Sequence, residues 1–365
     1  MAKTSFSSPK AADLLGWYQK HGRDLPWRSH GGRAPSPYHT WLSEIMLQQT
    51  GVITVIPYYH RFTTKWPTVY DLANAHEDDI LKEWAGLGYY SRARNLLKCA
   101  RMVVEKFGGT FPTNIAELKS LPGIGDYTAN AIRAIAYDLP ANVVDGNVER
   151  VTARVFAFDQ PINLPKNKVE LKALAAQLAP QKDASNYAQA IMDLGATICT
   201  PRNPKCSQCP WQKNCLAFAK GIQDILPVVQ KRPKIPHRQA TSFILQDKQG
   251  RLLLQQRPVA GLLGGLWEFP STNWDKKQDA DMLAETMPFP ADQFIQLPKP
   301  VIHVFTHFKL TMQIMVCRET ISSKAGKWFT SDDMPALSTL TEKILTAAIR
   351  YLPTRQIDKS VGGRG

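Results

Sequence analysis

The spacing of apolar residues changes character along the chain. Up to about residue 198 they recur at intervals of three and four, as Leu14, Leu15, Trp17 and Tyr18 do, and this spacing predicts amphipathic helices. Helices are expected early in 10–30, over 38–50, repeatedly within 52–110, from about 114, from 126 and over 168–198. Short runs beyond residue 238 predict strands instead, at 241–245, 251–256, 301–308 and 310–317. The chain is therefore expected to be multidomain, with a mostly α-helical module and then an α/β domain.

The expected boundary lies where this periodicity stops. Residues 223–237 mix Pro, Lys and Arg without a helical period, which is typical of an interdomain linker. We therefore expect a helical module over 1–222, an α/β domain over 238–355 and a disordered tail over 356–365. Gly, Ser and two Pro at 31–37 predict a loop within the first module.

The segment 121–126, LPGIGD, separates two of the predicted helices. Pro122 ends the first helix, and Asp126 stands where the second needs an N-cap. Gly123 and Gly125 allow a tight turn with positive φ and leave backbone amides uncovered. Amides at a helix N-terminus bind anions, and on a basic chain the expected anion is a DNA phosphate. Taken alone, the motif fits an ordinary αα-hairpin equally well.

Two carboxylates stand in apolar surroundings. Glu44 is the only carboxylate in the predicted helix 38–50, with apolar residues on several sides. A lone Glu on a helix is usually solvated, but burial here would raise its pKa and suit it to general acid catalysis. Asp145 follows an apolar run, and its simplest interpretation is a helix N-cap.

Charge and composition narrow the class of partner. Lys and Arg number 45 against 31 Asp and Glu, and the net charge of +14 suits a polyanion, although a protein without such a partner can carry it too. The sequence shows no apolar run of membrane-spanning length and no apolar signal segment at its start. We therefore expect no membrane partner and a reducing, cytoplasmic location.

Four of the six cysteines fall within residues 199–215, at spacings x6, x2 and x5. In a chain without signs of secretion, such a cluster indicates a metal rather than disulfides. Zinc sites usually combine two compact pairs, and this segment contains one.

These motifs together resemble the helix-hairpin-helix DNA glycosylases related to endonuclease III. The resemblance is close to one branch, the MutY-type adenine DNA glycosylases, with strong motifs over about 10–220 and weaker ones over 238–350. It rests on LPGIGDY at 121–127 with Asp145, SEIMLQQT at 43–50, and GLGYYSRARNL at 86–96. The uneven cysteine spacing is that of the superfamily's [4Fe–4S] loop, so the resemblance implies that Cys199, Cys206, Cys209 and Cys215 hold such a cluster in a structural or DNA-docking role.

The resemblance implies roles for the remaining residues. Glu44 protonates the leaving adenine, Asp145 stabilises the sugar cation, and Tyr127 assists. Bifunctional relatives carry a Lys where this chain has Tyr127, and a Tyr cannot form the imine that leads to strand cleavage. The implied adenine pocket includes Arg23, Trp27 and Gln189, with Gln48 and Gln49 near the lesion and Tyr89 as a wedge in the base stack. The implied DNA-backbone contacts are Gly123, Gly125, Arg202 and Lys205.

The second domain resembles the Nudix-like domain of the same branch. It lacks the REUxEExGU helix of active Nudix hydrolases, so pyrophosphatase activity is not expected. Phe305, Thr306 and His307 match a Phe-Ser-His segment that reads 8-oxoguanine in the family, with Thr in place of Ser. On residue pattern alone, these three would be assigned to strand core and surface.

We therefore expect a monofunctional glycosylase that hydrolyses the N-glycosidic bond of adenine mispaired with 8-oxoguanine or guanine. Its expected partner is double-stranded DNA containing such mispairs, and it is expected to act as a monomer in a bacterial cytoplasm. Two alternatives are a bifunctional glycosylase/lyase for oxidised pyrimidines and a non-enzymatic DNA binder. Tyr127, Glu44 and the second domain argue against the first, and the pairing of Glu44 with Asp145 argues against the second.

Overall fold

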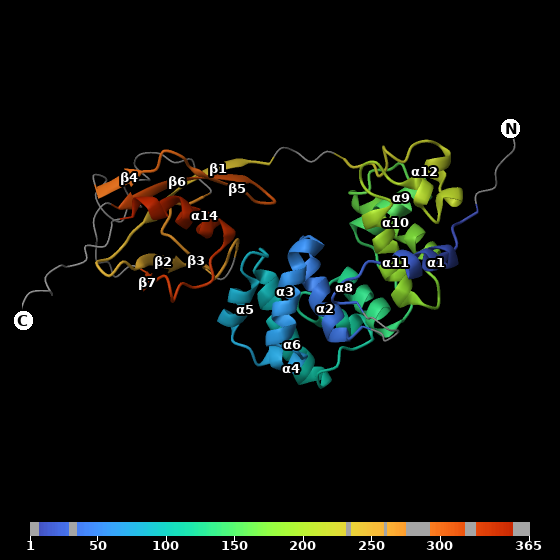
Figure 1. The fold of residues 1–365 in the computed structure, drawn as a ribbon, viewed down its shortest axis with the longest axis horizontal. Helices are drawn as coiled ribbons and strands as arrows, with labels where there is room; N and C mark the ends of the chain where they lie inside the picture. Colours follow the sequence, from blue (N-terminus) through green and yellow to red (C-terminus); the bar gives the residue numbers. More distant parts are fainter. Residues whose placement is uncertain are drawn as a thin grey trace, which may run out of the picture. The chain divides into compact units, whose positions relative to one another are not determined.

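The computed structural model describes residues 7–28, 35–230, 235–258, 261–274, 293–317 and 326–352. The chain forms two compact units, one made of Met1–Ala75 with Arg94–Arg232 and the other of His76–Ala93 with Pro233–Gly365 (Figure 1). The grouping of residues 76–93 with the later part of the chain was not expected from the sequence. The boundaries placed at 222 and 237 remain predictions, and the expected tail at 356–365 and parts of the expected loop and linker lie outside the described residues.

The first unit is helical. Its regular elements are α1 (Ala11–His21), α2 (Pro37–Leu47), α3 (Val52–Lys65), α4 (Val69–Ala73), α6 (Ser91–Phe107, from residue 94), α7 (Ile115–Ser120), α8 (Asp126–Ala131), η1 (Ile132–Ala136), α9 (Gly146–Val155), α10 (Pro165–Leu178), α11 (Ala184–Thr197), η2 (Cys206–Gln208), η3 (Gln212–Asn214) and α12 (Leu216–Ala219). The helix predicted over 38–50 ends at Leu47, so Gln48 and Gln49 follow it rather than extend it. Among the described residues, no helix is both long and apolar enough to cross a membrane.

The predicted hairpin lies between α7 and α8, with two corrections. Asn114 caps α7, and Gly123 has the expected positive φ of 79°. Gly125, however, is extended and is itself the N-cap of α8, so Asp126 is the first helical residue and not the cap. Its carboxylate instead pairs with Lys119 at 2.6 Å. The helix that begins at Asp126 then widens into a π-helix, η1, which brings Ile135 towards the candidate site described below.

Helices α9 and α11 of this unit pack closely against each other. Leu14 of α1, Val151 of α9 and Leu194 of α11 share one buried core. A Cβ added at Gly195 of α11 would stand 2.6 Å from the Cβ of Asn147 on α9, so only glycine allows this approach. The beginning of α9, where Asp145 is the N-cap, is thereby held against α11.

The second unit is built on two sheets. In the larger, β6 (Lys309–Cys317) pairs in parallel with β1 (His237–Ile244) and antiparallel with β4 (Phe294–Gln296) and β5 (Val301–Val304). In the smaller, β2 (Leu252–Gln256) lies between β3 (Trp267–Glu268) and β7 (Lys327–Phe329). The remaining elements are α5 (Glu77–Trp84), α14 (Thr339–Ala348) and η5 (Ile349–Tyr351).

Alternation along β6 places one face of the larger sheet in the core. Leu310, Met312, Ile314 and Val316 are buried together with residues of β2 and α14. One predicted strand is shorter than expected, because β5 ends at Val304. Residues 305–308 form the connection to β6, closed by a hydrogen bond from the amide of Phe305 to the carbonyl of Phe308 at 2.8 Å. The Phe305-Thr306-His307 segment therefore lies on a turn and not on a strand.

Candidate active site

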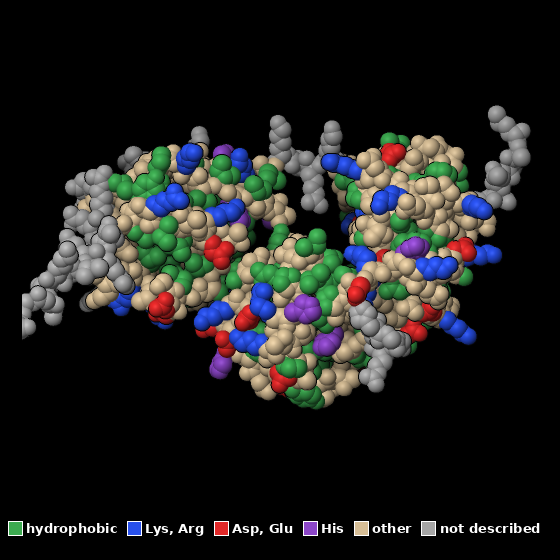
Figure 2. All heavy atoms as spheres, in the orientation of Figure 1, with side chains coloured by type: hydrophobic (Ala, Val, Ile, Leu, Met, Phe, Trp, Pro, Cys, Tyr) green, Lys and Arg blue, Asp and Glu red, His purple; other side chains and the backbone are tan. Residues whose placement is uncertain are grey.

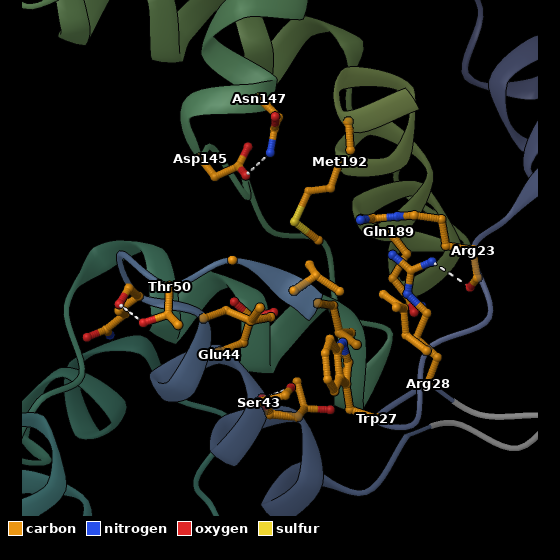
Figure 3. A pocket seen from close by; sticks show the side chains of 18 of the residues that line it. Arg23, Trp27, Arg28, Ser43, Glu44, Thr50, Asp145, Asn147, Gln189 and Met192 are labelled. Atoms are coloured by element: carbon orange, nitrogen blue, oxygen red, sulfur yellow. Dashed lines mark hydrogen bonds between the residues drawn. The ribbon is translucent and has the colours of Figure 1, made fainter. Parts of the chain in front are cut away.

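A cavity of about 450 Å³ opens in the first unit, within the size range of small-molecule pockets. Its walls come from α2, α8, η1, α11, the start of α9 and the turn at residues 23–28 (Figure 3). Of the residues singled out in the sequence, it brings together Arg23, Trp27, Glu44, Gln48, Gln49, Tyr127, Asp145 and Gln189. These positions span 166 places in the chain (189 − 23), so the fold, and not local sequence, makes them neighbours.

Glu44 is buried, which is the less usual of the two states that the sequence left open for a lone helical Glu. It is 6% exposed, on a helix whose residues 40–46 are all buried. Burial raises the pKa of the Glu44 carboxyl to about 7, assisted by the negative charge of Asp145 and opposed by a hydrogen bond from Tyr127 and by the charge of Arg28. Near neutral pH this carboxyl is therefore protonated in part of the molecules, as a general acid requires.

Asp145 combines the two roles that the sequence left open. As the N-cap of α9, it accepts the amide of Val148 through Oδ1 at 2.8 Å. Its Oδ2 accepts from the side-chain amide of Asn147, also at 2.8 Å. Two fixed donors orient the carboxylate while it lines the cavity. The capping bond is therefore part of what positions the group.

Tyr127 lies on the first turn of α8 and lines the same cavity. Its hydroxyl lies 3.5 Å from the sulfur of Met192 and also within reach of the Glu44 carboxyl, and its single hydrogen can serve one of these acceptors at a time. Burial raises the pKa of Tyr127 well above its usual value, and the charges of Glu44 and Asp145 raise it further. The hydroxyl therefore stays neutral, and it can donate a hydrogen bond but cannot act as an amine nucleophile.

A buried carboxylate that the sequence did not single out holds the turn at 23–28. Asp193 of α11 is 0% exposed and accepts four hydrogen bonds, from the amide and Nε of Arg23 at 2.8 and 2.7 Å and from the two terminal nitrogens of Arg28 at 2.7 Å. Burial alone would raise the pKa of Asp193, but the hydrogen bonds and charge of Arg28 and Arg23 outweigh it and the pKa is lowered. The ion pairs tie the wall that carries Trp27 to α11.

The three glutamines occupy different parts of the cavity wall. Gln189 is buried on α11, and its Nε2 donates to the carbonyl of Ser185 at 3.1 Å. Gln48 caps the end of α2 and donates to the hydroxyl of Thr128 at 3.3 Å. Gln49 is exposed, with a positive φ of 60°. Gln189 is thus an inner wall residue, whereas Gln49 lies at the rim.

The four clustered cysteines line a second, small cavity of about 30 Å³ with Arg154, Ile198 and Phe218 among its other walls. All six cysteines of the chain are free thiols. The terminal nitrogen of Arg154 donates to the sulfur of Cys199 at 3.3 Å and to the carbonyl of Thr200 at 2.7 Å. Four thiols converging on one cavity, with a cation beside one of them, fit the ligand set of an iron–sulfur cluster.

Two arginines connect this cysteine loop to the candidate active site. Arg150 and Arg154 both lie on α9, the helix that Asp145 caps. Arg150 donates to the carbonyls of Cys199 and Gly195 at 2.8 and 2.7 Å. The same helix thus carries the Asp145 carboxylate at one end and bonds to the cysteine loop along its length.

In the second unit, two residues predicted separately are in contact. The hydroxyl of Tyr89 lies 2.6 Å from the hydroxyl of Thr306. Tyr89 has a positive φ of 49° in the turn before α6 and is 48% exposed, and Thr306 and His307 are exposed as well. Phe305 instead packs inward between His303, Phe308 and Trp274. Tyr90, the next residue, is buried and donates to the carbonyl of Leu337.

The residues assigned to DNA-backbone contact all lie on the surface. Gly123, Gly125, Arg202 and Lys205 are exposed. Lysine and arginine side chains are spread over the visible face rather than gathered in one patch (Figure 2). Charge alone therefore does not locate a DNA site on this face.

Several residues of the site escaped the sequence reasoning. Arg28, Asn147 and Met192 line the cavity, whereas Asp193 and Ser185 lie behind its wall and bond to Arg28 and Gln189. A usable signal existed for Asp193, because it is a lone charge in an apolar helical run, the same feature that singled out Glu44. The others have no comparable mark in the sequence.

Comparison with protein-family models gives three matches. The HhH-GPD superfamily base excision DNA repair protein matches residues 42–181, the iron-sulfur binding domain of endonuclease III matches 199–215, and the NUDIX domain matches 241–347. The second match identifies the cofactor of the cysteine loop as an iron–sulfur cluster of the [4Fe–4S] type. The first and third confirm the expected fold class, a helical module followed by a Nudix-like domain.

Two relatives that match most of this chain are adenine DNA glycosylases. The chain is 36% identical to the adenine DNA glycosylase of Mus musculus, over 91% of this chain and 76% of the relative. It is 32% identical to the adenine DNA glycosylase of Buchnera aphidicola from Schizaphis graminum, over 87% of this chain and 91% of the relative. Among solved structures, a thermostable thymine-DNA glycosylase superposes with a TM-score of 0.51 at 32% identity, over 57% of this chain and 95% of that chain.

Proposed function

The chain belongs to the adenine DNA glycosylases, and we propose that its substrate is adenine mispaired with 8-oxoguanine or with guanine. As a member of that family it is a base-excision repair enzyme that acts on DNA and hydrolyses the N-glycosyl bond of adenine. Removal of adenine from such mispairs would prevent G:C to T:A mutations. The single observation that best supports a glycosidic mechanism is the cavity that holds Glu44, with its raised pKa, together with the oriented carboxylate of Asp145.

In the proposed mechanism the adenine leaves the base stack and enters the cavity beside Trp27, Arg23 and Gln189. The Glu44 carboxyl gives its proton to N7 of the adenine as the bond between N9 and C1′ breaks, and the bonding electrons stay with the base. The sugar takes on oxocarbenium character, and the Asp145 carboxylate stabilises that positive charge. Tyr127 assists by donating its hydroxyl hydrogen bond within the same cavity. A water molecule adds to C1′ and gives its proton to the Glu44 carboxylate, which restores the acid.

In this mechanism the enzyme does not cleave the DNA strand. A lyase needs an amine that forms an imine with C1′, and Tyr127 supplies a neutral hydroxyl at the position where the bifunctional relatives carry Lys. The cysteine loop takes no part in the hydrolysis. Cys199, Cys206, Cys209 and Cys215 would hold the cluster, which when bound crosslinks the loop through four iron–thiolate bonds.

Recognition of the opposite base is proposed for the second unit. Tyr89 would enter the base stack as a wedge, and Thr306 and its turn would contact 8-oxoguanine. Gly123, Gly125, Arg202 and Lys205 would bind the DNA backbone, with Gln48 and Gln49 near the lesion. We further propose that the enzyme acts as a monomer in the cytoplasm, where its cysteines would stay reduced.

The decisive experiment uses end-labelled duplexes with A:8-oxoguanine, A:G, A:T or G:T at one position. Alkali after incubation reveals any abasic site as a strand break. Breaks with A:8-oxoguanine and A:G, and none with A:T, would support the proposal. The G:T duplex is included because the superposed relative is named for thymine, and cleavage of that duplex alone would overturn the assignment.

The same reactions run with borohydride test the monofunctional assignment. The native protein should give little covalent adduct and few breaks without alkali, because its cavity offers no amine at residue 127. Tyr127→Lys should increase both. Efficient trapping by the native protein would show that another lysine performs lyase chemistry.

A further inference from the structure

Gln189 is held by a second residue behind the cavity wall. Its Nε2 lies 3.1 Å from the backbone carbonyl of Ser185 and 3.4 Å from the hydroxyl of Ser185. That hydroxyl in turn donates to the carbonyl of Ile135 at 2.7 Å. The amide of Ser185 donates to the carboxylate of Asp138 at 2.8 Å. Ser185 is thus anchored on both sides to the end of η1, and Gln189 is anchored to Ser185.

This arrangement fixes which end of the Gln189 amide meets the cavity. A backbone carbonyl can only accept a hydrogen bond, so the Gln189 atom beside it must be the nitrogen. The Ser185 hydroxyl has given its proton to Ile135 and can therefore only accept from the same nitrogen. The carbonyl and the hydroxyl of Ser185 both act as acceptors, so Nε2 of Gln189 faces Ser185. Oε1 is then the polar atom that Gln189 can present to the cavity. No donor among the described residues reaches Oε1.

The end of the helix leaves the Ile135 carbonyl available. The regular bond to it would come from the amide of Leu139, but that amide donates to the carbonyl of Arg133 at 3.0 Å. The amide of Asp138 donates to Ala134. The Ile135 carbonyl is therefore one of the orphan acceptors of a helix end, and Ser185 satisfies it.

We propose that Ser185 is a positioning residue that sets base specificity, because it makes Gln189 an acceptor for the exocyclic amine of a 6-aminopurine. The inference rests on the proposed excision of adenine and adds to it the reason for rejecting 6-oxopurines. Hypoxanthine and guanine carry an oxygen at position 6, which would face Oε1 acceptor to acceptor. An unsubstituted purine would leave Oε1 unpaired but unopposed. The expected order of affinity in the cavity is adenine, then purine, then hypoxanthine.

The test measures binding to duplexes with adenine, purine or hypoxanthine opposite 8-oxoguanine, each with a 2′-fluorine that slows cleavage. For each duplex, the affinity of the native protein is divided by the affinity of a variant. This ratio cancels differences in stability among the three duplexes. Gln189→Met, which removes the amide, should narrow the preference for adenine over hypoxanthine by roughly five- to 150-fold. Ser185→Ala leaves the backbone carbonyl in place, so it should narrow the preference by a smaller factor. Ser185→Thr should restore it.

Thr197→Val is the matched control, since Thr197 lies on the same helix and its hydroxyl also donates to a backbone carbonyl, that of Asp193, without touching Gln189. It should leave the preference unchanged. Equal weakening of all three bases by Gln189→Met would overturn a directional contact. An unchanged preference in Ser185→Ala, with Gln189→Met still narrowing it, would overturn the role of Ser185. Melting temperatures measured alongside separate loss of folding from loss of selectivity.

The inference and the proposed function fail differently. If the native protein removes no adenine from an A:8-oxoguanine duplex, the function itself is wrong. If it removes adenine but binds hypoxanthine more tightly than purine, the function stands and the acceptor orientation is wrong.

Discussion

The cavity around Glu44 and the exposed turn around Thr306 are built in opposite ways. Glu44 is 6% exposed, burial raises its pKa to about 7, and the Asp145 carboxylate that lines the same cavity accepts two hydrogen bonds. Tyr89 is 48% exposed, and its hydroxyl bonds to Thr306, a residue that is itself exposed. The polar groups of the cavity are buried, whereas those of the turn around Thr306 are exposed to water.

The contrast follows from what the two proposed tasks need. A general acid gains its pKa from a dry environment, and a carboxylate that stabilises a cation must already point at it. A residue that reads a base in a duplex must instead be reachable by that duplex, so it stays at the surface. Large effects are therefore expected from changes in the cavity and moderate, substrate-dependent effects from changes in the turn.

The largest effect is expected for Glu44→Gln. The amide keeps the shape of the side chain but has no acidic proton, so the single-turnover rate of adenine release should fall by about 10²–10⁴-fold while mispair binding persists. Asp145→Asn should also bind and lose turnover. Glu149→Gln, a change of the same kind on α9 outside the cavity, serves as control. A loss below roughly tenfold for Glu44→Gln would contradict its role.

Thr306→Val should come next. It keeps the branched shape and removes the hydroxyl, so binding to A:8-oxoguanine should weaken by about 1–3 kcal/mol, the worth of one base-edge contact. Binding to A:G should be nearly unchanged, and Thr306→Ser should behave like the native protein. Equal losses on both duplexes would indicate a structural effect. No loss on either would move lesion reading to other residues of the turn or to Tyr89.

A third test uses pH. Because burial raises the pKa of Glu44 to about 7, the protonated acid is depleted above that value. The single-turnover rate should therefore fall by up to about tenfold per pH unit above neutrality, and Glu44→Gln should lack this dependence.

The free energy of unfolding should also fall as the pH rises. A folded-state pKa above the unfolded one favours folding fully below the unfolded value near 4.3, and this contribution is lost as pH rises through about 7. Denaturant midpoints across that range would measure it, with Glu44→Gln as the reference.

The smallest effect is expected for Tyr89→Phe. The ring that would enter the base stack is retained, and the change removes a hydrogen bond worth about 0.5–1.5 kcal/mol at an exposed site. Affinity for mispaired DNA should change by less than with Tyr89→Ala, which removes the wedge itself. Equal losses in the two variants would show that the hydroxyl, and not the ring, carries the contribution of Tyr89.

The same contrast shows what the sequence could predict. Burial of Glu44 was predictable, because apolar residues on successive helical faces leave a charge no route to solvent. The turn at 305–308 was not, since residues on both sides favour strand and a single hydrogen bond closes the connection. Gly125 was expected to have positive φ and is extended, because one glycine, Gly123, suffices for the turn. Contacts between distant positions, such as Tyr89 with Thr306 or Asp193 with Arg28, leave no local pattern to detect.

Helix α9 connects the Asp145 carboxylate in the cavity to the cysteine loop of the first unit. Its N-terminal cap is the Asp145 carboxylate, and Arg150 and Arg154 fasten its length to the cysteine loop. If that loop loosened, α9 would tilt, and the Asp145 carboxylate at its N-terminus would be displaced. In a preparation with partial cluster content, the damage would divide the molecules into competent and incompetent populations. Arg154→Met should accordingly reduce the amplitude of a single-turnover burst while the rate constant of the remaining molecules stays close to native.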